Sequence, residues 1–121
     1  RLQGDWSSDV CSSDLHIVFN RKETVKIDKL DNIELDFSKY NFLNIDVQGY
    51  ELEVFKGGIN CLNNNIDYII SEINKDELYK DCSKVDEVKI FLGQFGFELI
   101  EESWDGVTWG DGLFVKNNLL R

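Results

Sequence analysis

The chain has 121 residues, enough for one small domain, and 42% of them are hydrophobic, so it has material for a core. Its net charge of −10 disfavours a nucleic-acid backbone as partner, because such binding needs a surplus of Lys and Arg. No apolar run approaches the roughly 20 residues of a membrane span, and no signal peptide is recognisable. We therefore expect a cytoplasmic protein that neither binds nucleic acid nor spans a membrane.

The cysteines are Cys11, Cys61 and Cys82, and His16 is the single histidine. An odd number of cysteines without C-x-x-C spacing argues against a disulfide framework and against a zinc site. We expect buried or idle reduced thiols and no zinc site; two carboxylates could hold a divalent cation, but nothing in the sequence demands one. His16 receives no role, because it adjoins a segment whose origin is in question.

That segment is Asp5–Leu15, which reads DWSSDVCSSDL. A nucleotide string that encodes it closely resembles a widely used short-read sequencing adapter primer. The match extends over eleven consecutive residues, so coincidence is a poor explanation, although a natural Ser/Asp-rich tail is the alternative. We predict that residues 1–15 are a non-native, disordered leader and that residues 16–121 are natural protein.

The following segments predict two short strands and a linker. His16–Phe19 is short and apolar, and Thr24–Ile27 alternates apolar and polar residues, as strands do. Residues 29–40 (KLDNIELDFSKY) mix apolar and charged side chains without a clear period, which predicts a linker with a helical turn.

A first strand–helix unit follows the linker. Phe42–Val47 is a compact apolar run, which predicts a strand buried on both faces. The next residues place apolar side chains at three- and four-residue steps, up to Leu62, and so predict a helix with one apolar face. Gly57 and Gly58 are expected to break or cap this helix.

A second unit repeats the pattern. Ile66–Ile73 predicts another buried strand. Ser83 and Asp86 resemble a capping box, and the apolar stripe behind them predicts a helix that ends at Gly96.

Residues 97–103 and 112–117 predict two strands, and the short connection WDGVTWGD predicts an antiparallel hairpin. Packing within the hairpin is the favoured role of Trp104 and Trp109, with ligand stacking as the alternative. Alternating strands and helices indicate an α/β fold with a mostly parallel sheet and one antiparallel strand at its side. Phe42–Val47 is expected in the middle of that sheet.

Acidic side chains follow both buried strands. Ligands bind beyond the carboxyl ends of parallel strands, which is where Asp46 and Glu72 are predicted to lie. Asp46 is the strongest candidate, because an acid that ends an apolar strand costs desolvation unless it has partners. Gly49 permits a sharp turn, and Glu51 lies in the first turn of the helix. Glu51 has the alternative of a helix-start charge, and Glu72 that of a loop anchor that accepts backbone hydrogen bonds.

Residues 43–58, LNIDVQGYELEVFKGG, resemble the central motif of the FkbM-family methyltransferases, whose usual form is close to K-I-D-V-E-G-x-E-x-x-V-L-K-G. Leu30 and Asp31 match a pair in the family's T-L-D-D-L segment. The predicted strand that contains Glu72 and the predicted terminal hairpin also resemble segments of this family. The resemblance extends from Thr24 to Asn117, with the segments in the right order.

The resemblance implies a Rossmann-like class I methyltransferase fold, S-adenosylmethionine as cofactor and methyl transfer to a hydroxyl oxygen of a small-molecule, sugar or lipid acceptor. Asp46, Gly49 and Glu51 fall on the family's D-x-x-G-x-E positions, and Glu72 falls on the acid after the next strand. Asp46, Glu51 and Glu72 are thus the candidate catalytic residues. Asp46 and Gly49 are the candidate cofactor contacts. Gln48 replaces the usual Glu, which removes one negative charge from the edge of the site.

The family's Gly-rich cofactor turn, which joins a strand to a helix in the first half of the fold, has no counterpart in this sequence. The glycine pair in Lys56–Ile59 follows the wrong strand. We therefore expect the C-terminal half of a methyltransferase, inactive by itself. The alternative is a non-catalytic small α/β binding or interaction module.

Overall fold

A computed structural model describes residues 18–76 and 80–120 of the chain. The predicted leader, Cys11 and His16 lie outside these ranges. In chain order the elements are the 3-10 helices η1 (Leu30–Asn32) and η2 (Phe37–Lys39), β1 (Phe42–Ile45), α2 (Glu51–Lys56), α3 (Ile59–Asn64), β2 (Tyr68–Asn74), α4 (Val85–Gly93), β3 (Phe97–Trp104), β4 (Trp109–Lys116) and the 3-10 helix η3 (Asn117–Leu119).

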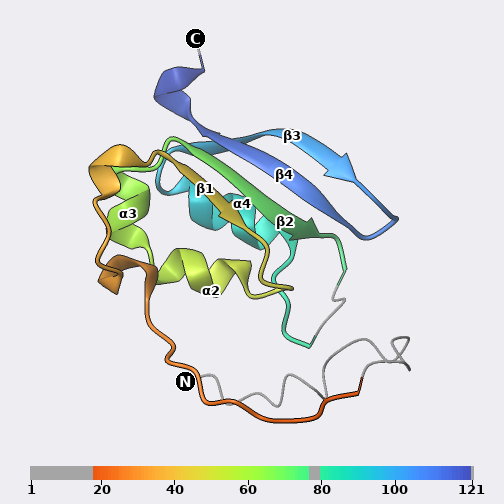
Figure 1. Ribbon diagram of the computed structural model, residues 1–121. Helices are drawn as coiled ribbons and strands as arrows, with labels where there is room; N and C mark the ends of the chain where they lie inside the picture. The colour runs from red at the N-terminus through yellow and green to blue at the C-terminus, as the bar shows by residue number, and fades with distance from the viewer. Residues whose placement is uncertain (1–17, 77–79, 121) are drawn as a thin grey trace.

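The four strands form one sheet in the order β1-β2-β4-β3 (Figure 1). β1 and β2 are parallel, whereas both pairings of β4 are antiparallel. The α/β class and the terminal hairpin are confirmed, but the prediction of a mostly parallel sheet is wrong, because the sheet is mixed. The reason is that the tight turn forces β4 to run against β3, and β4 rather than β3 pairs with β2. The antiparallel strand therefore lies inside the sheet.

The three α-helices of the described residues lie on one face of the sheet (Figure 1). Side chains from this face of the strands form one buried cluster with those of the helices, including Ile69, Ile73 and Phe114 from the sheet and Phe55 and Leu92 from the helices. Alternate residues of the same strands point to the opposite face, which we call the open face. The core is thus confined to one side of the sheet.

β1 differs from its prediction in position and in burial. Within the described residues no strand pairs with β1 on its outer side, so β1 is an edge strand and not the middle of the sheet. Only its inward face is covered: Ile45 is buried, whereas Phe42 is 51% exposed. The apolar run therefore reflects one covered face and a partly exposed open face, not burial on both sides.

The strand predicted at Thr24–Ile27 does not form, and the first half of the one predicted at His16–Phe19 lies outside the described residues. Residues 18–29 contain no regular element, and Val25 and Ile27 are exposed. A strand needs a neighbour to satisfy its backbone hydrogen bonds, and none lies beside this segment in the described residues. The linker prediction is confirmed, since η1 and η2 are single helical turns.

The predicted break at the glycine pair separates α2 from α3. Asp31 stabilises this break, because its carboxylate accepts the N–H groups of Asn60 at 2.9 Å and of Cys61 at 3.0 Å at the start of α3. Leu30 packs on Gly58, where a Cβ would lie 2.7 Å from a Leu30 methyl carbon. The two sequence segments that resemble the family motifs therefore meet at this break.

The second helix is confirmed, but its predicted cap is displaced. α4 begins at Val85, and the Glu87 carboxylate accepts the Lys84 N–H at 2.8 Å. The Ser83 hydroxyl is buried and has no hydrogen-bond partner, so Ser83 and Asp86 do not form the predicted capping box. Gly96 has φ +81 just beyond the helix, as expected of a glycine that stops a helix.

Candidate functional site

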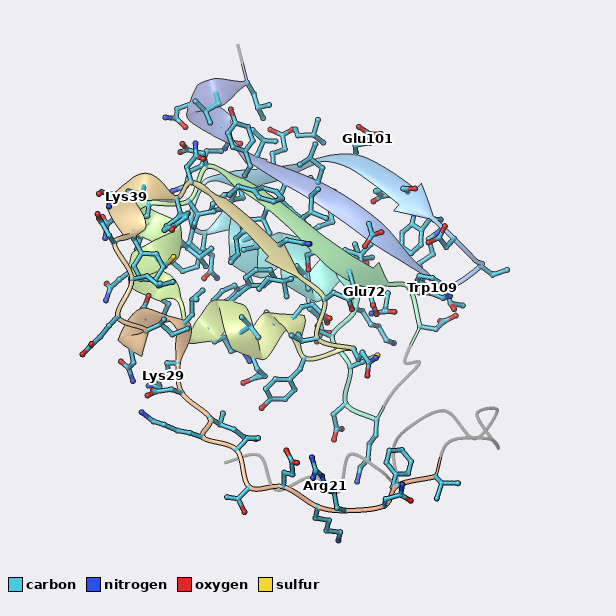
Figure 2. The ribbon with its side chains drawn as sticks, viewed as in Figure 1. Arg21, Lys29, Lys39, Glu72, Glu101 and Trp109 are labelled. Atoms are coloured by element: carbon cyan, nitrogen blue, oxygen red, sulfur yellow. The ribbon has the colours of Figure 1, made fainter. Side chains whose placement is uncertain are left out.

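Asp46 and Glu72 lie side by side at one end of the open face. The parallel register pairs Ile45 with Ser71, so the next residue of each chain segment brings these two acids together. Asp46 is exposed and Glu72 is half-buried, at the end of β2 that Trp109 also borders (Figure 2). The register thus places both acids at the carboxyl ends of the parallel strands, as expected from the sequence.

Glu51 is the buried carboxylate of the group, with 1% of its surface exposed. Its Oε1 accepts the N–H groups of Val47 and Gly49, both at 3.1 Å. The loop between β1 and α2 folds around this oxygen, and Gln48 and Gly49 adopt φ +54 and +96 to do so. Left-handed backbone at Gln48 is strained for a residue with a Cβ, so the loop is held by these contacts.

This arrangement exchanges two roles that the sequence suggested. The sequence predicts a desolvated carboxylate at Asp46, but Asp46 is exposed and Glu51 is buried. The alternative role of Glu72 is to accept backbone hydrogen bonds from a loop, but Glu51 accepts the loop N–H groups. The structure therefore places Asp46 and Glu72 where a ligand can reach them, and Glu51 beneath them.

Glu72 has a strongly perturbed pKa. Burial is the largest cause, and it raises the pKa of this carboxyl to about 7. The hydrogen bond from Asn74 acts in the opposite direction, while the negative charge of Glu51 and the hydrogen bond and charge of Asp46 raise the pKa further. A carboxyl with this pKa is poised to take up and release a proton near neutral pH.

Asn74 belongs to this site, although the sequence gave it no role. It is fully buried, its Nδ2 donates to Glu72 Oε1 at 3.4 Å, and its Oδ1 has no hydrogen-bond partner. Trp109 is the partner of Asn74 across the sheet. A polar residue that continues the predicted strand Ile66–Ile73 by one position was the signal available in the sequence.

The two tryptophans of the hairpin have different surroundings. Trp104 contacts Lys75, whose Nζ lies 3.9 Å from the ring centre, and donates from Nε1 to Glu102 at 3.1 Å. Trp109 lies against Gly106 and is 42% exposed. Trp104 thus has the predicted packing role, and Trp109 leaves an aromatic surface beside the carboxylates.

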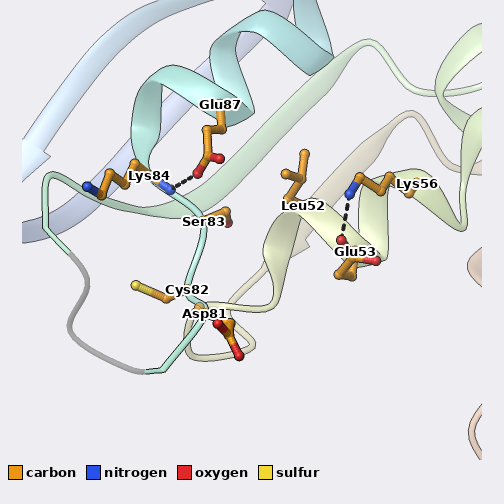
Figure 3. A pocket seen from close by; sticks show the side chains of 9 residues that line it. Leu52, Glu53, Lys56, Asp81, Cys82, Ser83, Lys84 and Glu87 are labelled. Carbon is orange, nitrogen blue, oxygen red and sulfur yellow. Dashed lines mark hydrogen bonds and ion pairs between the residues drawn. The ribbon is translucent and has the colours of Figure 1, made fainter. Parts of the chain in front are cut away.

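A cavity of about 450 Å³ lies on the other side of the loop, between α2 and the start of α4 (Figure 3). The loop and this wall are joined by the Ser83 N–H, which donates to the Gly49 carbonyl at 3.1 Å. Lys56 at its rim pairs with Glu53 at 2.6 Å. Its wall therefore carries charges of both signs, and Gly49 faces it rather than the paired acids.

Other kinds of site receive little support in the ranges that the structure covers. No three His, Cys, Asp or Glu side chains there are placed to hold a metal ion. Cys61 and Cys82 are free and buried, and burial raises the pKa of the Cys61 thiol, with a further contribution from Asp31. None of the helices between residues 18 and 120 that the structure describes is long and apolar enough to cross a membrane.

A sulfonium methyl donor carries a positive charge, so acidic side chains are the groups that would suit it. Asp46 and Glu72 provide negative charge, which would favour a positively charged sulfonium. The sequence has one G-x-G spacing, Gly110 to Gly112, but it lies within β4. A Cβ at Gly110 would overlap the backbone of β3, so this spacing allows close strand packing and does not form a cofactor turn.

Comparison with known proteins gives one result. A family model, described as the methyltransferase FkbM domain, matches residues 3–99. The matched range contains Asp46, Gly49, Glu51 and Glu72, together with Asn74. No match was found among curated proteins or among solved structures.

Proposed function

Since the chain belongs to the FkbM methyltransferase domain family, we propose that it forms the acceptor side of a methyltransferase that uses S-adenosylmethionine. The methyl group is transferred to a hydroxyl oxygen. The observation that carries this proposal is the position of Asp46 and Glu72, since the parallel register places these two residues side by side at the carboxyl ends of their strands, where ligands bind in α/β sheets.

The proposed fold is a portion of a Rossmann-like class I methyltransferase. The element order from β1 to β4 and the position of the acids at one sheet edge support this proposal. The exposed outer edge of β1 also suits a fold in which further strands extend the sheet. We retain the division proposed from the sequence, with an adapter-like leader in residues 1–15, although the family match begins at residue 3.

S-adenosylmethionine supplies an electrophilic methyl group when it is bound. Asp46 would lie next to its positive charge, and Gly49 remains a proposed contact that would act through its backbone. We expect the chain by itself to lack measurable affinity for this donor, because the Gly-rich turn is not found in its sequence.

The acceptor is proposed to be a small molecule, sugar or lipid with a free hydroxyl. Asp46 is exposed and so can contact such a group, whereas Glu72 has the pKa of a base that works near neutral pH. Trp109 offers an aromatic surface beside both.

The second candidate is a non-catalytic binding module. The apolar part of the open face favours it, since Tyr68 and Ile70 are 38% and 36% exposed and Phe42 adjoins them. A binding module needs no proton acceptor, so this candidate does not explain why Asp46 and Glu72 lie side by side.

Labelled methyl transfer by the intact gene product that contains this chain tests the proposal. We expect label on an acceptor oxygen, and we expect Asp46→Asn to reduce kcat/KM by about 10²-fold or more. Asp111→Asn is the matched control, because Asp111 is the exposed cross-strand partner of Glu72. Absence of methyl transfer would favour the binding module, and equal rates for both variants would remove the role of Asp46.

A further inference from the structure

The cavity between α2 and the start of α4 lies apart from the acids of the open face (Figure 3). Its volume of about 450 Å³ falls within the range of roughly 300–1,000 Å³ that is typical of small-molecule sites. Ser83 and Glu87 border it on the side of α4, and Leu52 and Lys56 border it on the side of α2. The cavity therefore has the size of a ligand site and carries polar groups on two sides.

Ser83 has a buried hydroxyl that lacks a hydrogen-bond partner among residues 18–76 and 80–120. The residue is 8% exposed, and Figure 3 shows its side chain directed toward the space between α2 and α4. Buried polar groups are almost always paired, because an unpaired one destabilises the fold. A serine hydroxyl can donate and accept, and it turns about a single bond, so a ligand in the cavity can supply the missing partner.

The backbone of the same residue holds this wall of the cavity in place. The Ser83 N–H donates to the Gly49 carbonyl at 3.1 Å, and the Gly49 N–H donates to Glu51 Oε1 at 3.1 Å. Gly49 is thus held from both sides. A wall that is fixed before the ligand arrives loses little conformational freedom on binding, which favours affinity.

Two charged side chains retain hydrogen-bonding capacity beside this hydroxyl. Glu87 Oε2 accepts the Lys84 N–H at 2.8 Å, and a carboxylate can accept further hydrogen bonds. Lys56 Nζ donates to Glu53 Oε1 at 2.6 Å, and an ammonium group carries three N–H donors. Figure 3 shows the side chain of Lys84 directed away from α2. The cavity thus offers an acceptor at Glu87, a donor at Lys56 and a hydroxyl that can act as either.

The charges of the wall favour a neutral ligand. An anionic group would approach the carboxylates of Glu53 and Glu87, and a cationic group would approach the ammonium group of Lys56. Leu52 is the one large apolar side chain among the described residues that line the cavity, so a long apolar chain would leave the Ser83 hydroxyl unpaired. A molecule with several hydroxyl groups meets these demands, because it can donate to Glu87, accept from Lys56 and place its C–H surface on Leu52.

We propose that the cavity between α2 and α4 is a binding site for a neutral sugar or other polyol, with Ser83 and Glu87 as its main contacts. The site is distinct from Asp46 and Glu72, and binding there does not depend on the proposed function. Because Ser83 also holds Gly49, the bound sugar lies against the segment that fixes the loop between β1 and α2.

Amide NMR of the isotopically labelled chain, titrated with glucose, galactose and myo-inositol, tests the proposal. We expect at least one of these neutral probes to shift the Ser83 and Gly49 signals with a Kd of about 1 mM or tighter. Glucose 6-phosphate should bind at least about fivefold more weakly than glucose, because its phosphate meets the carboxylates of Glu53 and Glu87.

Substitutions of the two main contacts should weaken the binding. Ser83→Ala should raise the Kd about three- to tenfold, since the ligand loses one hydrogen bond, and the variant keeps the fold because it removes an unpaired hydroxyl. Glu87→Gln should raise the Kd about threefold, and its amide oxygen still accepts the Lys84 N–H. Ser103→Ala is the matched control, an exposed serine on β3 that should leave the Kd unchanged.

Three results would contradict the proposal. Unchanged Ser83 and Gly49 signals with about 10 mM of each neutral probe would remove the site. Equal affinity of Ser83→Ala and Ser103→Ala would place the sugar outside this cavity. Tighter binding of glucose 6-phosphate than of glucose would show that the ligand is anionic and not neutral.

Discussion

The helix-covered face and the open face of the sheet alternate along the same strands but differ in burial and chemistry. In β2, Ile69 is fully buried on the covered face, whereas its neighbour Ile70 is 36% exposed on the open face. Past Ile70 the open face becomes acidic, with Glu72 beside Asp46. The covered face therefore supplies most of the stability of the fold, and the open face can carry neighbouring acidic side chains.

Alanine substitutions on the two faces should differ most in their effect on the free energy of unfolding. Ile69→Ala should lower the free energy of unfolding by about 3–4 kcal/mol, because it leaves a cavity in the core. Ile70→Ala should cost about 1 kcal/mol or less, since the side chain is partly in water already. Chemical denaturation measures both values, and equal losses would show that the open face is covered in solution.

Glu51 differs from Asp46 and Glu72, because it is an acidic residue that the fold needs for stability. Glu51→Ala should cost about 2–3 kcal/mol, since the N–H groups of Val47 and Gly49 lose their acceptor. Glu53→Ala is the matched control on the same helix, and its exposed pair with Lys56 contributes about 0.5 kcal/mol or less. A loss for Glu51→Ala no larger than that of the control would mean that the loop holds its shape without the carboxylate.

The pH dependence of stability should come from the open face. The pKa of Glu72 is raised when folded, so its contribution to stability is fully present below the unfolded value of 4.5 and is lost as pH rises through about 7. The free energy of unfolding should fall by about 1–2 kcal/mol across this window, a value reduced for solvent screening. Denaturation at pH 5 and pH 8 measures the fall. Glu72→Gln should flatten it, and a wild-type slope retained in that variant would assign the effect to another group.

Substitution of Asp31, which accepts hydrogen bonds at the start of α3, should have the smallest effect on the free energy of unfolding. Asp31→Ala should cost about 1 kcal/mol, because two N–H groups at the start of α3 lose their acceptor. Asp31→Asn retains an acceptor oxygen and should recover part of the loss. Thermal unfolding of the two variants provides the measurement, and identical melting of both with the unaltered chain would show that Leu30 alone holds this segment.

The elements with a strong local pattern could be predicted from the sequence. The helical spacing of apolar residues around Val88 and Leu92 predicted α4, and the pair Gly57 and Gly58 predicted the break before α3. The order of the strands could not be predicted in the same way, because β4 pairs with β2 across a sequence separation that no local pattern encodes. The strand predicted at Thr24–Ile27 is wrong for the same reason. Alternating apolar and polar residues are typical of a strand, but they do not provide a neighbouring strand to pair with.

The site was predicted in part. The positions of Asp46 and Glu72 followed from the strands that precede them, and the register then brought the two acids together. Which acid is buried could not be read from the sequence, since it depends on how the loop folds around Glu51. Asn74 could be noticed as a polar residue after the predicted strand Ile66–Ile73, but its burial and its unpaired Oδ1 depend on the tertiary fold.

The most direct test of the central claim is the pH profile of methyl transfer by the gene product that contains this chain. If Glu72 takes the proton of the acceptor, kcat/KM should rise with pH about a midpoint near 7, and Asp111→Asn should keep that profile. Glu72→Gln should abolish the rise and reduce the rate. A profile without an inflection near 7, or one that Glu72→Gln retains, would contradict the account.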